Sequence, residues 1–247
     1  MQITFLGTSH GVPSCDRYCS CALIEAGNSF YFIDAGAPVA DLVHRRGLDV
    51  RNFRAVFTTH VHSDHTAGIP ALAGLLHWRY RDCAADFFLT EPPLAAAMEA
   101  LIAASDPEIP PCRERVRFRI AEAGEVYRDE NIKVTYIPTH HMGAGHPTYA
   151  ILVTEGDKTA LFTGDLSHGL KHNDLPAVAL EGGVDLMACE LAHFGLLELA
   201  PYLEGLRVKT LCFHHVSPVD KYGDINAIRD RYPFTVHTPK DGDTLTL

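Results

Sequence analysis

The chain has 247 residues, and hydrophobic residues make up 47% of them, which is typical of a globular protein with a sizeable core. Its formal charge of -10 counts against nonspecific binding to nucleic-acid backbones, although a local basic patch is compatible with that charge. The first residues show neither the basic nor the apolar segment of a signal peptide, and no apolar run has the length of a membrane span. We therefore expect a cytoplasmic protein that does not enter a membrane.

Seven cysteines, an odd number, are spread along the chain, as is typical of reduced thiols. Three of them, Cys15, Cys19 and Cys21, lie close together, but no fourth ligand follows nearby. We interpret them as free thiols in preference to a small structural metal site.

The first half of the sequence begins with β-rich runs and continues with helical ones. Gly, Pro or Asn turn signals separate the predicted strands ITFLG, CALIEAG, FYFIDAG and AVFTTH. Pro38 near the start and Gly47 past the end indicate a short helix over PVADLVHRRG. Two further helices are predicted over AGIPALAGLLHWRYR and PPLAAAMEALIAAS.

The second half returns to strands and then alternates strand and helix. The predicted strands include RVRFRI, VYRDENIKVTYI and YAILVTEGDKTALFTGD, the last two with turns at 129–131 and 155–157. The last third, which runs through DLMACEL, GLLELAPYLEGL, KTLCFHH and INAIRDRY, mixes both types. Because no linker or repeat interrupts residues 1–247, we predict one domain. Two similar successions of strands and helices favour a four-layer α/β/β/α sandwich, although only the motifs below select that architecture.

A dense polar segment, FTTHVHSDHTAG, follows one of the predicted strands. His60 and His62 are two residues apart, so in an extended segment both imidazoles point the same way and can reach one ion. Asp64 and His65 lie at the turn into the next helix and can reach a second ion beside the first. Imidazole favours zinc or iron, and carboxylate adds tolerance for manganese.

The other candidate ligands each follow a predicted strand as well. His140 and His141 end VTYIPTHH, Asp165 ends TALFTGD, and His214 and His215 end KTLCFHH. Side chains at strand ends converge on one rim of a sheet, so these residues predict a metal site. Asp165 follows a glycine in a tight turn and is suited to bridge two cations. Three other histidines, His44, His77 and His237, are interpreted as packed or solvated residues.

These motifs resemble those of the metallo-β-lactamase superfamily over nearly the whole chain. The first to fifth motifs of that superfamily are similar to FIDAG, H-x-H-x-D-H at 60–65, IPTHH, FTGD and HHVSP. The resemblance implies the four-layer sandwich and two divalent metal ions, zinc first, with manganese or iron as alternatives. It implies that one ion is bound by His60, His62 and His141, the other by Asp64, His65 and His215, with Asp165 shared and Asp34 supporting the ligands from behind. His140 and His214 remain alternatives to His141 and His215.

Two metal ions that share a carboxylate lower the pKa of a water between them, so hydrolysis is the expected reaction class. Flavodiiron oxidoreductases carry Glu at the position of His62, and class B β-lactamases carry Cys at that of Asp165, so both activities are disfavoured. A lactone or thioester hydrolase is the alternative enzyme. A metal-binding interaction module without catalysis is the alternative from another class.

The opening FLGTSHGVPSCDRYCSCALIEAG resembles the tRNA 3′-endonucleases and related cyclic phosphodiesterases of this superfamily. CELAHF is similar to their acidic motif, which implies Glu190 and His193, with Asp64, as catalytic residues. The tRNA enzymes insert a long arm between the third and fourth motifs, whereas here residues 141–165 are taken up by a β-hairpin. We therefore expect a small phosphodiester or cyclic phosphate as substrate and no nucleic-acid partner; the oligomeric state stays open.

Further histidines are candidates for contact with the substrate. His168 and His172 follow Asp165 and could orient a phosphate or protonate a leaving group, or could lie in a solvated loop. His146 could line the site or cap a turn, and His10 in the first loop is open in the same way.

Overall fold

The computed structural model describes residues 1–218 and 221–247, which form two seven-stranded sheets packed face to face. The first sheet has the strand order β14 (Thr244–Thr246), β1 (Gln2–Gly7), β2 (Cys21–Ala26), β3 (Ser29–Ile33), β4 (Phe53–Phe57), β5 (Ala85–Leu89) and β6 (Val116–Ile120). The second has the order β13 (Thr235–His237), β12 (Val208–Val216), β11 (Val184–Leu191), β10 (Lys158–Phe162), β9 (Thr148–Glu155), β8 (Lys133–Thr139) and β7 (Gly124–Arg128).

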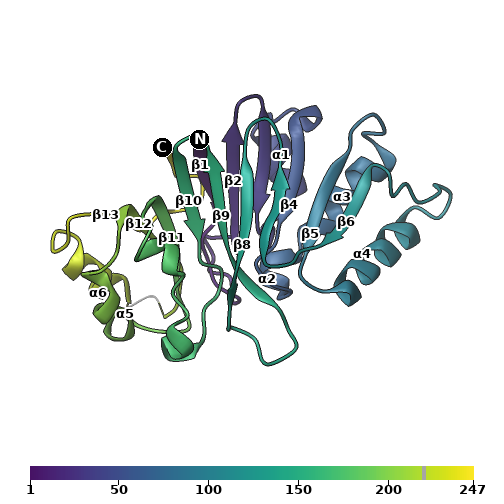
Figure 1. Cartoon of the computed structure of the whole chain (residues 1–247). Helices are drawn as coiled ribbons and strands as arrows, with labels where there is room; N and C mark the ends of the chain where they lie inside the picture. Colours follow the sequence, from purple (N-terminus) through teal and green to yellow (C-terminus); the bar gives the residue numbers. More distant parts are fainter. Residues whose placement is uncertain (219–220) are drawn as a thin grey trace.

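Helices cover the outer faces of both sheets (Figure 1). Helices α1 (Val39–Arg45), α3 (Ile69–Trp78) and α4 (Pro92–Ser105) pack on the outer face of the first sheet. Helices α5 (Leu196–Leu203) and α6 (Lys221–Ile228) pack on the outer face of the second. The remaining helical segments are short: α2 (Ser63–Thr66) and the 3-10 turns η1 (Val50–Asn52), η2 (His168–Asn173) and η3 (Ala177–Ala179).

Three apolar clusters separate these layers. Tyr31 and Phe57 from the first sheet pack with Tyr136 and Phe162 from the second, so the central cluster lies between the sheets. The two outer clusters join each sheet to its helices, as Leu72 of α3 does on one side. The predicted four-layer α/β/β/α sandwich is therefore confirmed.

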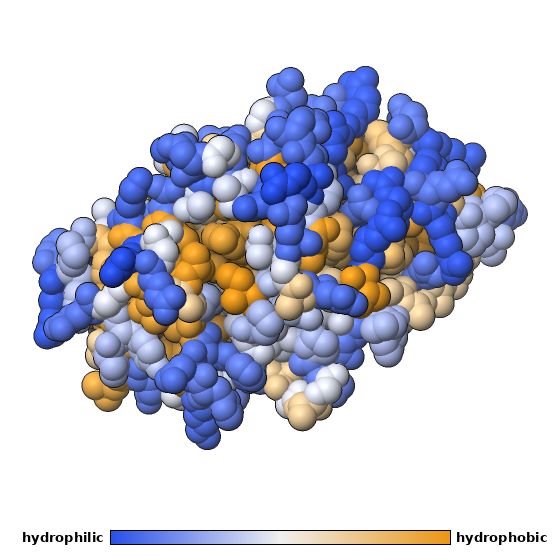
Figure 2. Space-filling view, in the orientation of Figure 1, coloured by the Kyte–Doolittle hydropathy of each residue, from blue (hydrophilic) through white to orange (hydrophobic). Residues whose placement is uncertain are grey.

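One face of the molecule is mainly polar. Hydrophilic residues cover most of the face in Figure 2, while apolar residues are grouped near its middle. Among the helices of residues 1–218 and 221–247, none is both long and apolar enough to cross a membrane.

The strand directions explain where the polar strand-end residues gather. Strands β3 to β6 are parallel to one another, and so are β10 to β13. Strand β8 runs antiparallel to β9, which runs antiparallel to β10, so β8 and β10 point the same way. The carboxyl ends of β8, β10, β11 and β12 therefore share one edge of the second sheet. The site is built on the loops at that edge.

Most predicted elements are present, with four differences. The helix expected over AGIPALAGLLHWRYR is divided into α2 and α3, which are separated by Ala67 and Gly68. Three strands were not predicted: β5, β13 and β14. Two of these, β13 and β14, have three residues each, which is too short to show an alternating apolar pattern. β14 forms because it pairs with β1, at the other end of the chain.

Gly36 is required where the chain passes the segment that carries Asp64. A Cβ at Gly36 would collide with the backbone carbonyl oxygen of Asp64 and lie 3.0 Å from the Cβ of Cys19. Both neighbours belong to packed backbone segments rather than to flexible side-chain ends, so neither can move aside at low cost.

We predict that Gly36→Ala lowers the free energy of unfolding by about 2 kcal/mol or more, because the new methyl group overpacks this contact. The matched control is Gly74→Ala in α3, where a Cβ meets no atom within 4 Å. That change should raise stability by up to about 1 kcal/mol, since Ala favours helix over Gly. Denaturant unfolding of the two variants measures both values, and equal stability for Gly36→Ala and the unchanged chain would contradict the packing described.

Candidate metal centre

Three histidines and one aspartate form a first group of possible ligands. The Nε2 atoms of His60 and His141 lie 3.0 Å and 3.4 Å from Nδ1 of His62. Both Nε2 atoms also lie 3.7 Å from Oδ2 of Asp165. Three imidazole nitrogens and one carboxylate oxygen facing one point is the donor set that zinc takes in proteins.

A second group lies on the other side of Asp165. Nε2 of His65 is 3.4 Å from Oδ1 of Asp165 and 3.5 Å from Oδ2 of Asp64. Nε2 of His215 is 3.6 Å and 3.2 Å from the same two oxygens. The two oxygens of Asp165 thus face different groups: Oδ2 faces the first and Oδ1 faces the second.

Buried polar groups behind the site orient two of these imidazoles. Nδ1 of His65 donates to Asp34 Oδ2 at 2.7 Å, and Nδ1 of His60 donates to Thr59 Oγ1 at 3.0 Å. Thr59 in turn donates from Oγ1 to Asp34 at 3.0 Å and from its backbone N at 2.8 Å. With their Nδ1 protons held in this way, His60 and His65 present the Nε2 lone pair to the centre.

Charge and burial act in opposite directions on these groups. Burial lowers the pKa of His60 well below its ordinary value, which favours the neutral imidazole that a metal requires. Although burial opposes it, the hydrogen bond from His215 holds the pKa of Asp64 below its ordinary value. A neutral imidazole beside an ionised carboxylate is the protonation state in which both can bind a cation.

The donor set fits divalent cations. Among the described residues, Nε2 of His65 and Oδ1 of Asp165 are buried and have no hydrogen-bond partner. Burying a polar atom without a hydrogen-bond partner is costly and uncommon. These two atoms face each other. A cation between them would satisfy both atoms at once.

Local structure decides which histidine of each adjacent pair, 140–141 and 214–215, enters the site. His140 donates from its backbone N and from Nδ1 to the buried Asp174, at 3.0 Å and 2.8 Å, so its side chain is held away from the centre. In β12 the pairing with β11 skips His215, which is therefore a bulged residue, with φ of 53°. The bulge directs His215 into the centre, while His214 lies inside the sandwich beside Phe5, where burial lowers its pKa to about 3. The structure thus brings His141 and His215 into the site, and not His140 or His214.

Glu190 and His193 lie beside the first group. The carboxylate of Glu190 is fully buried and accepts hydrogen bonds from the backbone N of Leu166, Ala192 and His193, and from Nδ1 of His193 at 2.9 Å. Glu190 also belongs to a third possible ligand group, with His193, His215 and Asp165, but its oxygens already accept these four bonds. Glu190 is therefore placed behind His193, and not where it would itself touch a substrate.

The other candidate histidines lie at different distances from the centre. The ring of His168 is 4.8 Å from that of His193, and the ring of His10 is 6.3 Å from that of His215, so both lie at its rim. The exposed ring of His172 is 5.4 Å from that of His140, farther out. His146 forms an ion pair with Glu91 at 2.9 Å, on the loop between β8 and β9.

Two supporting residues had no signal in the sequence. Asp174 accepts from Ser167 N as well as from His140, and so links the loops that follow β8 and β10. Nζ of Lys221 donates to the backbone carbonyls of Leu191 and Phe194, both at 2.8 Å, and holds the segment that carries His193. A single lysine or aspartate in a polar loop is too common a feature to be singled out without coordinates.

A family model described as Anti-Pycsar protein Apyc1 matches residues 1–227. The chain belongs to the Apyc1 family. Ribonuclease Z from Synechococcus sp. (strain WH7803) is 31% identical to this Apyc1-family chain over 166 residues, which are 66% of the chain and 50% of the relative. The chain spans about half the length of the curated relatives that it matches.

Solved structures show the same fold. The metallo-β-lactamase fold protein YhfI from Bacillus subtilis has a TM-score of 0.78 and 16% identity, with 99% of this chain and 98% of that chain covered. A diphosphatase from the PhnP family has a TM-score of 0.68 and 18% identity, with 100% and 97% covered. The motif-based prediction of the metallo-β-lactamase superfamily, in the branch of the tRNA 3′-endonucleases and phosphodiesterases, is confirmed.

We predict that Asp34→Asn weakens zinc binding about 10–100-fold, because it removes the carboxylate that fixes the His65 ring. Asn tolerates the left-handed backbone of Asp34, whose φ is 54°, so the fold should be retained. Zinc competition against a chromophoric chelator measures the affinity. The control is Asp49→Asn, an exposed residue that pairs with Arg51. Equal zinc affinity in both variants would contradict the supporting role of Asp34.

Proposed function

We propose that the chain is a metal-dependent hydrolase that cleaves a small phosphodiester or cyclic phosphate. The observation that carries the proposal is the position of Asp165, whose two carboxylate oxygens face two separate groups of ligands. Two divalent cations held there would polarise a phosphoryl oxygen and lower the pKa of a water molecule.

The ligand groups give each side chain a role in this proposal. One ion, zinc in the first place, would be held by His60, His62 and His141, and the other by Asp64, His65 and His215, with Asp165 shared. Asp34 and Thr59 orient the imidazoles from behind. The whole of residues 1–247 would act as one hydrolase domain.

His193 is placed to protonate the leaving group. Although burial opposes it, the hydrogen bond to Glu190 Oε1 raises the pKa of His193, which favours the protonated ring. In that ring Nδ1 donates to Glu190 and Nε2 holds the proton for the leaving group; the ring centroid is 4.4 Å from that of His141. Glu190 is a positioning residue, because it accepts the Nδ1 proton and is itself fully buried. Such a pair fixes which imidazole nitrogen carries the transferable proton.

The surroundings of the centre favour a small substrate. A hollow of about 500 Å³ is lined by residues of the 139–147 loop and by His172, and none of the proposed metal ligands is among its lining residues. Residues 140–147 alone join β8 to β9, so this connection has no room for a long substrate-gripping arm. A large polyanion needs basic contacts that release counterions, whereas this chain has 31 acidic and 21 basic residues.

The relatives support more than one substrate class. Similarity to a protein named ribonuclease Z favours a nucleic-acid substrate. Similarity to a diphosphatase of the PhnP family favours a smaller phosphate compound. A lactone or thioester remains the second candidate, because the same centre could attack a carbonyl. The paired arrangement of Glu190 and His193 beside the ligands argues against a module that only binds metal.

We predict that the zinc-loaded chain cleaves a nitrophenyl phosphodiester and a cyclic nucleotide with higher kcat/KM than a lactone, a thioester or a precursor tRNA. Asp165→Ala should abolish the activity, because the two ligand groups lose their common member. His44→Ala should leave it intact, since His44 lies on α1 and bonds Tyr80. Faster cleavage of the lactone, the thioester or the tRNA would overturn the substrate assignment.

A second prediction concerns proton transfer. Glu190→Gln should lower kcat about 100-fold for a phosphodiester with an alkyl leaving group, because the His193 Nδ1 proton then loses its carboxylate acceptor. The same variant should lose much less with nitrophenol as the leaving group, which departs without protonation. Glu125→Gln, at an exposed pair with Arg128, is the matched control. Equal losses with both leaving groups would show that Glu190 acts only through folding.

A further inference from the structure

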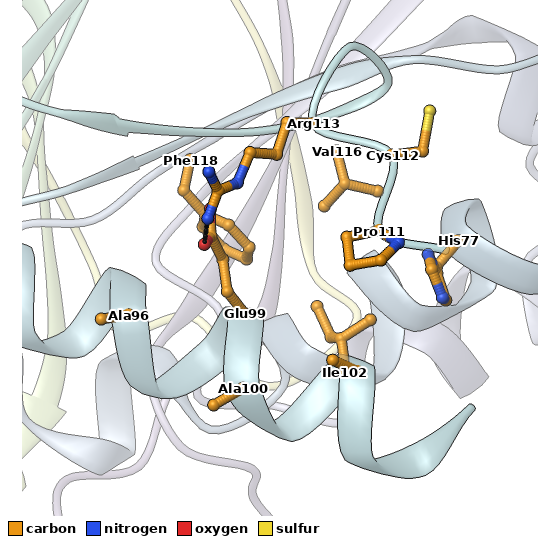
Figure 3. A pocket seen from close by; sticks show the side chains of 11 residues that line it. His77, Ala96, Glu99, Ala100, Ile102, Pro111, Cys112, Arg113, Val116 and Phe118 are labelled. Carbon is orange, nitrogen blue, oxygen red and sulfur yellow. Dashed lines mark hydrogen bonds and ion pairs between the residues drawn. The ribbon is translucent and has the colours of Figure 1, made fainter. Parts of the chain in front are cut away.

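A second hollow lies on the outer side of the first sheet, between α4 and residues 111–118 (Figure 3). Its volume is about 320 Å³, and its walls include Ile102, Val116 and Phe118. We propose that this cleft binds a small, neutral, mostly apolar molecule that carries a hydroxyl group. The proposed metal ligands and the residues that support them are not among those that line it, so the inference does not rest on the proposed function.

His77 supplies the polar point of the cleft. Its ring lies at one end, beside Pro111 (Figure 3), and the residue is 2% exposed. Among the described residues, its Nε2 atom is buried and has no hydrogen-bond partner. Native interiors rarely leave such an atom unpaired, because burying an unpaired polar group is costly. A ligand hydroxyl that shifts the side chains covering Nε2 and bonds this atom would remove the cost.

The rest of the cleft matches an apolar molecule. Ala96, Ala100 and Ala103 of α4 have short side chains and leave the space open, while Ile102 and Val116 form a buried wall. Ligand pockets in proteins have volumes of about 300–1,000 Å³ and apolar walls with few polar groups. The cleft is at the lower end of that range, which limits its ligand to a molecule of about one or two rings.

The charges at the cleft disfavour an ionic ligand. The two charged residues that line it, Glu99 and Arg113, already pair with each other at 2.6 Å (Figure 3). Neither charge is therefore left over for a ligand, and the walls offer an ion no replacement for its water. A hydroxyl group is suitable in another respect, since it can donate to or accept from Nε2 in either tautomer of the His77 ring.

The test compares p-cresol with toluene, which has the same ring and methyl group but no hydroxyl. Calorimetric titration of the full chain should show p-cresol binding at least tenfold more tightly than toluene. His77→Leu keeps an apolar side chain at this buried place and should abolish that preference. Ala100→Trp should prevent binding of both compounds by filling the cleft. Leu101→Trp, on the exposed side of α4 and outside the lining, should leave the binding unchanged.

Thermal unfolding verifies that each variant is folded before titration. Equal affinity for the two compounds in the unchanged chain, or a tenfold preference that survives His77→Leu, would overturn the proposal. So would p-cresol binding that Ala100→Trp does not weaken. Sedimentation of the unchanged chain tests the other occupant: self-association that only Ala100→Trp disrupts would mean that a second copy fills the cleft.

Discussion

The buried carboxylate of Asp165 is the group on which the site depends. It is 3% exposed. Four imidazoles, those of His60, His65, His141 and His215, have a nitrogen within 3.7 Å of its oxygens, and they come from β12, from α2 and from the loops after β4 and β8. A carboxylate at this depth is stable only where positive charge or hydrogen bonds replace its water. The two sheets supply these groups at one place. The carboxyl ends of β8, β10, β11 and β12 in the second sheet lie beside the segment 58–66 that follows β4 in the first sheet.

Fixed polar groups behind that carboxylate set the direction of two of the proposed ligands. Asp34 holds His65, and Thr59 connects Asp34 to His60, so a single buried acid orients two imidazoles. Glu190 does the same for His193. The backbone adds to this order at Asp34 and His215, which both adopt positive φ, a conformation that non-glycine residues hold at a cost and mainly at functional positions.

The cluster of histidines and aspartates that could bind metal was predictable from the sequence because its members lie just after short apolar runs, and strand ends gather by the geometry of parallel sheets. The choice within each doublet depended on resemblance alone. The physical reasons, a bulge at His215 and the bond from His140 to Asp174, arise from pairings between residues distant in the chain. Strand β14 could not be predicted for the same reason, because it forms by pairing with β1 at the other end of the chain. The cleft at His77 was not predicted either, since the sequence indicated this residue only as packed or solvated.

Anomalous diffraction at the zinc absorption edge, from crystals of the zinc-loaded chain, tests the central claim most directly. The account predicts two peaks on opposite sides of Asp165, one among His60, His62 and His141 and the other among Asp64, His65 and His215. A single peak, or a peak bound by Glu190 and His193 in place of either group, would contradict it.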